Sequence, residues 1–165
     1  LPEKALRLTG FEPNTAAEAL IPKGMSRFYL DEAESLQACI PGAGGVFTAR
    51  SLAKIYAALA NHGEIDGVRL LSEKTVGELV KVHNRNRGDV VPMAMHWRLG
   101  YHRVFTTWPK TPYAFGHFGY GGSGAWADPS RHLAVGYIVN TGSGSPFADL
   151  RIWKINTAII EAVGG

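Results

Sequence analysis

Cysteine and concentrated charge are the scarcest features of this chain. Cys39 is the single cysteine among 165 residues, so no disulfide can form within the chain. Charged residues make up 19% of the sequence, and the net charge is only +3. The densest positive stretch, residues 81–87, is short and contains no Phe, Tyr or Trp. It gives no reason to expect nucleic acid as a partner.

Long apolar runs are also missing. No stretch of the sequence is long and apolar enough to span a bilayer, so we expect no membrane span. No signal peptide is recognisable at Leu1, and the chain does not begin with Met. We therefore expect a fragment or a processed product, and the sequence gives no indication of its compartment.

Glycine and apolar residues are plentiful instead. The chain has 20 glycines and 45% hydrophobic residues, which is ordinary for a globular protein with a core. So much glycine favours strands and loops over a helix bundle. At this length the chain is one domain or part of one. We expect an α+β fold, with helices and loops in residues 1–92 and with sheet strands and a C-terminal helix in residues 93–165.

Residues 113–140 are the best-organised stretch. Two β-prone runs, residues 123–127 and 133–139, flank Asp128-Pro129-Ser130-Arg131, which favours a turn, so the pattern predicts a hairpin. A third extended run, residues 113–120, precedes the hairpin and carries His117. Several glycines lie between these runs, and such density beside a strand indicates close approach of backbone or ligand. They are Gly119, Gly121, Gly122 and Gly124.

Two helices are predicted upstream of this stretch. Thr48 is expected to cap a helix that ends near Gly63, and Ser72 to cap a second one. A turn at Asp66-Gly67 separates them. The residues expected to face the core are Leu52, Ile55, Tyr56 and Leu59 in the first helix, and Val76, Leu79 and Val80 in the second.

A further strand and a last helix complete the predicted elements. Residues 95–105 alternate well enough for a strand. Ser145 is expected to cap the last helix, with Pro146 in its first turn. Near the start of the chain, residues 15–20 are expected to form a helical turn and residues 25–30 a short strand. The apolar residues expected to pack the last helix on the sheet are Leu150, Trp153, Ile159, Ile160 and Val163.

The order of motifs in residues 113–140 resembles the C-terminal signature of the penicillin-recognising serine hydrolases. This family includes class C β-lactamases, DD-peptidases and β-lactamase-fold esterases. The resemblance rests on His117-Phe118-Gly119, on Gly121-Gly122 and on Trp126-Ala127-Asp128-Pro129, followed by an apolar strand that closes on Asn140. The third motif of the family is Lys-Thr-Gly or His-Thr-Gly, on a strand beside the active site. A Pro-x-x-Gly-Gly turn before the first predicted helix also fits this family.

The resemblance implies roles for individual residues. His117 takes the Lys or His position of the third motif, Gly119 lets substrate lie against the strand, and the amide of Tyr120 is one donor of an oxyanion hole. Phe118, Gly121 and Gly122 are implied to contact substrate. Phe118 replaces the usual hydroxyl residue, which favours an ester or amide with an apolar acyl group over a penicillin. The other interpretation of His117 is a buried histidine that bonds a backbone carbonyl.

The other two motifs of this family are not found. Ser51-Leu52-Ala53-Lys54 matches Ser-x-x-Lys by letters, but helical geometry directs Lys54 toward solvent, so we reject Ser51 as the nucleophile. No Tyr-x-Asn or Ser-x-Asn occurs in the sequence. Lys110-Thr111-Pro112 has proline where the third motif needs glycine.

Two functions from different classes therefore remain. The first is the C-terminal part of a serine hydrolase that acts on a small ester or amide and pairs with the N-terminal half of the same fold. The second is a non-catalytic binding module with that fold. No cofactor is expected. Gly42-Ala43-Gly44-Gly45 resembles the start of a dinucleotide-binding loop, but Phe47 stands at the position of that loop's third glycine. No metal is expected either, because no two histidines have helical i, i+4 spacing and no carboxylates cluster with them.

Overall fold

The computed structural model describes residues 15, 18, 19, 32–42, 44–88, 90, 91, 93–119, 121–142 and 149–164, and its largest sheet is antiparallel. The chain divides into two units, residues 1–47 with 87–94 and residues 48–86 with 95–165. In the first unit the structure describes the short helix α3 (Ala33–Gln37). The elements described below belong to the second unit.

The sheet has four strands in the order β3 (His102–Arg103), β4 (Phe115–Phe118), β5 (Gly124–Asp128) and β6 (Leu133–Tyr137). The predicted hairpin is confirmed as the β5–β6 pair. Asp128 explains its turn: the buried carboxylate accepts bonds from the Ser130 amide at 3.0 Å and from the Ser130 hydroxyl at 2.6 Å, and pairs with Arg131 at 2.7 Å.

Helices α4 (Ala49–Ala60) and α5 (Glu73–Val80) pack on one face of the sheet. Thr48 and Ser72 cap them, as predicted: each hydroxyl accepts a bond from the third amide of its helix. At Gly136 of β6 an added Cβ would lie 2.4 Å from the Ala49 carbonyl oxygen, so glycine there lets α4 approach the sheet closely. The buried residues of this layer are Leu59, Ala60, Leu79, Phe115 and Ala127.

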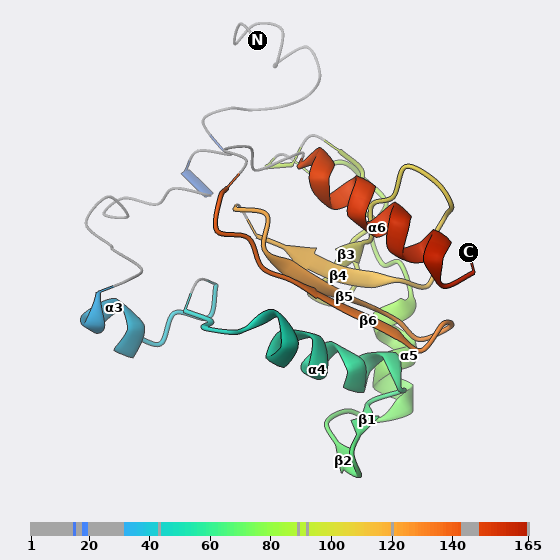
Figure 1. Cartoon of the computed structure of the whole chain (residues 1–165). Coiled ribbons are helices and arrows are strands. Elements are labelled where there is room, and N and C mark those ends of the chain that lie inside the picture. The colour runs from blue at the N-terminus through green and yellow to red at the C-terminus, as the bar shows by residue number, and fades with distance from the viewer. Residues whose placement is uncertain are drawn as a thin grey trace, which may run out of the picture. The chain divides into compact units, whose positions relative to one another are not determined.

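Helix α6 (Leu150–Ala162) packs on the opposite face, so the sheet lies between helices (Figure 1). The buried residues of this layer are Val104, Ala114, Trp126 and Ile160. Asn156 joins them: its side-chain oxygen accepts the Trp126 indole N–H at 2.9 Å, and its amide donates to the Phe105 carbonyl at 3.0 Å. Both buried polar groups are therefore satisfied.

The predicted apolar face of this last helix was partly wrong. Leu150 and Val163 are 63% and 51% exposed, whereas Ile152 and Asn156 are buried. The residues of this helix that face the core are Ile152, Asn156 and Ile160, at i, i+4, i+8 spacing. The polar Asn156 lies among them because the buried Trp126 indole needs a hydrogen-bond acceptor. Asp149 is the observed N-cap, and the predicted cap Ser145 lies outside the described residues together with Pro146.

The predicted strand over residues 95–105 is also shorter than expected. Only His102–Arg103 pairs with β4, and Trp97 makes an isolated bridge to Asn84. His96 and Gly100 take positive φ values of 51° and 78°, which interrupt extended backbone. Upstream, the turn at Asp66-Gly67 is confirmed between β1 (Glu64–Ile65) and β2 (Val68–Arg69).

The predicted strand at residues 25–30 and most of the turn at 15–20 lie outside the described residues. Within the part of the chain that the structure covers, no helix is long and apolar enough to cross a membrane.

Candidate functional site

Strand β4 places His117 on the same face of the sheet as α4 and α5. Phe115 is buried in that layer, and His117, two residues further along, is exposed and stands opposite Ala125 of β5. Phe118 faces the other way and packs against the cluster under α6. Two residues with implied roles, His117 and Phe118, thus lie on opposite faces of one strand.

The ring of His117 contacts a second histidine that sequence reasoning did not single out. His102 of β3 lies with its ring centroid 5.2 Å from that of His117, and it is buried at 3% exposure. Its Nδ1 lies 2.7 Å from the Arg103 carbonyl oxygen, which only accepts, so Nδ1 carries the proton. No sequence signal finds His102, because the contact depends on the pairing of β3 with β4, in which His102 stands opposite Gly116.

Both imidazoles favour the neutral form. Burial lowers the pKa of His102 to about 4, against the smaller opposing effect of its bond to the Arg103 carbonyl. The pKa of His117 is lowered as well, because neighbouring atoms shield its ring from water even though the residue as a whole is exposed. At neutral pH His117 can therefore donate or accept a hydrogen bond without carrying charge.

A tight glycine turn follows His117 and leaves the end of the strand open. The Gly119 amide donates to the Ser123 carbonyl at 2.8 Å, and the Gly122 amide donates to the Gly119 carbonyl at 3.0 Å. An added Cβ at Gly119 would find its nearest atom 3.7 Å away, and one at Gly121 would find nothing within 4 Å. Among the described residues, none fills the space directly beside the Cα of either glycine. Tyr120, whose amide is implied as an oxyanion donor, lies outside the described residues.

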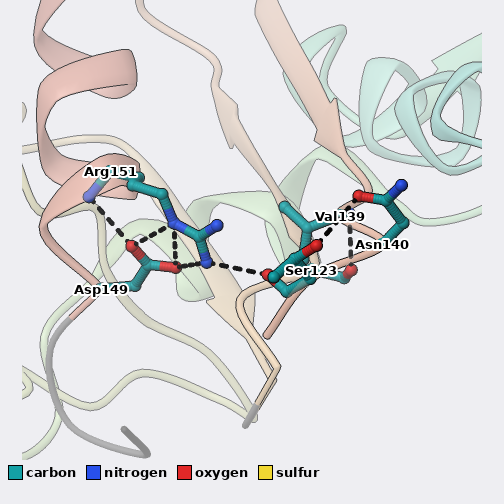
Figure 2. Close-up of polar contacts among 6 residues, drawn as sticks. Ser123, Val139, Asn140, Asp149 and Arg151 are labelled. Carbon is teal, nitrogen blue, oxygen red and sulfur yellow. Dashed lines mark hydrogen bonds and ion pairs between the residues drawn. The ribbon is translucent and has the colours of Figure 1, made fainter. Parts of the chain in front are cut away.

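Two side chains that the sequence did not point to, Asp149 and Arg151, form an ion pair next to Gly122 of this turn (Figure 2). The carboxylate of Asp149 accepts bonds from the Arg151 guanidinium at 2.6 and 2.9 Å, and Arg151 also donates to the Thr141 carbonyl at 3.1 Å. These bonds from Arg151 lower the pKa of Asp149. Gly122, at φ +98°, leaves room for the Asp149 carboxylate: an added Cβ would lie 2.8 Å from it.

The Ser-x-x-Lys match lies on α4, and its two polar side chains are occupied there. The Ser51 hydroxyl accepts a bond from the Thr48 amide at 3.0 Å and so completes the capping box of the helix. Lys54 is 64% exposed, as expected, and pairs with Asp66 at 2.7 Å. Neither group is prepared to act as an acylation pair, which needs a desolvated lysine beside its serine.

Metal-binding groups do not gather in the described part of the chain. Over those residues, no set of three or more His, Cys, Asp or Glu side chains is placed to hold a metal ion. The chemistry available at the site is hydrogen bonding from a neutral imidazole beside an open strand end.

Comparison with known proteins places this geometry in a family. The Beta-lactamase family model matches residues 3–158. The chain is 44% identical over 116 residues to "Esterase/beta-lactamase LipL" of Mycobacterium tuberculosis, covering 66% of this chain and 25% of that protein.

Two solved structures are also similar to it. A penicillin-binding protein homologue from Caulobacter crescentus matches with a TM-score of 0.76 and 32% identity, over 92% of this chain and 41% of its own. A family VIII carboxylesterase matches with a TM-score of 0.56 and 34% identity, over 62% of this chain and 28% of its own. The chain thus spans well under half the length of each of these proteins.

Proposed function

Because this chain belongs to the beta-lactamase family, we propose that it forms the C-terminal part of a serine hydrolase that cleaves an ester or amide by acyl transfer. The observation that carries the proposal is the position of His117, exposed on β4 directly before an open glycine turn. In this proposal the rest of the fold supplies the nucleophilic serine and its lysine.

The proposed roles are those implied by the family resemblance, and the exposed position of His117 supports them. His117, neutral at pH 7, donates a hydrogen bond to the substrate or to a catalytic hydroxyl. Gly119, Gly121 and Gly122 keep side chains away from the place where the acyl group lies, and the Tyr120 amide serves as one oxyanion donor. The Gly119 amide already bonds Ser123, so it is not assigned as a donor.

An ester is the favoured substrate class. Phe118 packs against the cluster under α6 and offers no hydroxyl to a substrate carboxylate. The names of two relatives, an esterase/beta-lactamase and a carboxylesterase, agree with this choice. We propose a small ester with an apolar acyl group.

A non-catalytic binding module is the second candidate. It is favoured by the state of the only Ser-x-x-Lys in the sequence, whose serine caps a helix and whose lysine pairs with Asp66. A module of this kind would keep the open strand end for binding but would form no acyl-enzyme.

The test compares this chain with a longer protein that contains it. Both are assayed with 4-nitrophenyl butyrate and with a chromogenic cephalosporin. We expect no turnover by residues 1–165 alone, and ester turnover by the longer protein that Ser51→Ala leaves unchanged. Turnover by the chain alone that Ser51→Ala abolishes would overturn the assignment of the nucleophile to the rest of the fold. An inactive longer protein that still binds the ester would favour the binding module.

A further inference from the structure

A hollow on the second unit contains none of the residues assigned to acyl transfer. Its volume is about 420 Å³, which is within the range of small-molecule sites. The side chains of Arg98, Arg103 and Lys110 line it, with Arg85 and His96 beside them. Among the lining residues that the structure describes there is no Asp or Glu. The hollow is therefore strongly cationic.

Arg98 is the most unusual of these residues because its charge is buried. Its side chain is 6% exposed, and two backbone carbonyls fix it: Nε donates to Val80 at 2.9 Å and Nη2 to Pro112 at 2.8 Å. Its Nη1 has no hydrogen-bond partner among the residues that the structure describes. Leaving a buried charged donor unpaired costs free energy, so such a group in a hollow indicates a missing acceptor.

Among the described residues, no carboxylate bonds this nitrogen. Asp128 acts on Arg98 electrostatically, but its bonds are to Ser130 and Arg131. Burial lowers the pKa of Arg98, and the positive charge of Arg85 lowers it further. An anion in the hollow would oppose both effects.

Arg103 provides a second unpaired donor with an aromatic wall behind it. Its Nε is buried without a partner, and its guanidinium lies 4.6 Å from the centroid of the Phe105 ring. Phe105 in turn stacks on Trp153, with centroids 5.1 Å apart and planes 9° apart. The apolar part of the lining also includes Val104 and Pro112. The hollow thus offers two guanidinium groups for a negatively charged head and flat apolar surface for a body.

We propose that this hollow binds a small organic acid, with its carboxylate at the guanidinium groups of Arg98 and Arg103 and its apolar body against Phe105 and Trp153. Carboxylates match the donor geometry of guanidinium groups, and the bonds are charge-assisted. The apolar wall favours an organic acid over inorganic phosphate, which has no body to place there. The site does not depend on the acyl-transfer proposal, because His117 and the glycine turn are not part of it.

Benzoate is the probe, with acetate, inorganic phosphate and chloride compared at constant ionic strength. Amide chemical shifts and thermal unfolding of the chain are followed during titration. We expect saturable binding of benzoate, a rise of the unfolding temperature with its concentration, and weaker binding of acetate and phosphate. Arg98→Gln and Arg103→Gln should each weaken benzoate binding by about tenfold or more. Arg50→Gln, an exposed arginine of α4, is the matched control and should leave binding unchanged.

Several results would overturn the proposal. One is a benzoate response equal to that of chloride, and another is equal weakening by Arg50→Gln and Arg103→Gln. Phosphate binding more tightly than benzoate would overturn the assignment to an organic acid. If Arg98→Gln does not fold, Arg103→Gln and Lys110→Gln decide the outcome by the same weakening of benzoate binding, because Lys110 is exposed and Arg103 is less buried than Arg98. A longer protein that fails to bind benzoate while this chain binds it would show that an acidic residue of the rest fills the hollow, which would also overturn the proposal.

Discussion

The buried ring of His102 meets the ring of His117 edge to face, with centroids 5.2 Å apart and planes at 66°. The ring of His102 also packs against the rings of Trp97 and Phe105, with centroid distances of 5.8 and 5.7 Å. Its Nδ1–H is fixed on a backbone carbonyl, which sets the tautomer. A rigid, neutral ring therefore supports the histidine that we place in the site, as second-sphere residues do at other active sites.

Stability should fall as the pH is lowered because of His102. Its folded pKa of about 4 lies below the usual value of 6.5, so the unfolded chain binds a proton between these values and the folded chain does not. The stabilisation is fully present above pH 6.5 and is lost as the pH falls toward 4, by roughly 3 kcal/mol. Urea unfolding at pH 7 and pH 5 measures the larger part of this loss, about 2 kcal/mol. His102→Phe should flatten this dependence and His132→Asn, an exposed control, should not. If the free energy of unfolding depends on pH equally in wild type and His102→Phe, the lowered pKa of His102 is not the cause.

Gly122→Ala should destabilise the protein much more than Gly121→Ala. The backbone of Gly122 has φ +98°, and the new Cβ would lie 2.8 Å from the Asp149 carboxylate, whereas a Cβ at Gly121 meets nothing within 4 Å. We expect a loss of about 1–3 kcal/mol for Gly122→Ala. Thermal unfolding of the two variants side by side is the measurement. Equal stabilities would contradict the positive φ of Gly122 and its close approach to the Asp149 carboxylate.

Asn156→Leu should be costly although it adds an apolar residue to the core. It leaves the Trp126 indole N–H and the Phe105 carbonyl without their hydrogen-bond partner. Each buried polar group left unpaired lowers the stability by about 1–3 kcal/mol. Lys154→Leu changes an exposed position of the same helix and serves as the control. The free energy of unfolding in urea should fall for the first variant and stay within about 0.5 kcal/mol of wild type for the second. A neutral Asn156→Leu would contradict the buried bonds.

The isolated chain should self-associate at high concentration. β6 is the last strand in the sheet order, and none of the described residues pairs with its outer edge. Light scattering should show a mass that rises with concentration. Ile138→Lys changes an exposed residue directly after β6 and should reduce the association. Val68→Lys changes an exposed residue of β2 and should not. A monomer across the whole concentration range would contradict this prediction.

Local features of this fold could be predicted from the sequence, and distant pairings could not. Thr48 and Ser72 act as caps through bonds to residues three positions away, and the turn at Asp128 closes through its own neighbours. These interactions depend on adjacent residues only. The positive φ values of His96 and Gly100 were missed because alternation alone cannot report them.

The hollow and the support of the site depend on residues far apart in the chain. Arg98 is held by carbonyls 18 positions before it and 14 positions after it, and Asn156 bonds a tryptophan 30 positions away. In the sequence these residues stood within a predicted strand and a predicted apolar helix. Composition and hydrophobic periodicity give no sign of such pairs, so the cationic hollow was visible only in the structure.

The acylation rate of His117→Asn in a longer protein that contains this chain tests the central claim most directly. It is measured in the pre-steady state with 4-nitrophenyl butyrate, beside the free energy of unfolding, and His132→Asn is the matched control at an exposed histidine. We predict a rate lower by about 100-fold, as for loss of a catalytic hydrogen-bonding or proton-transfer group, with little change in stability. A rate equal to that of the control, together with a loss of about 1–3 kcal/mol of stability, would show that His117 serves the fold and not the reaction.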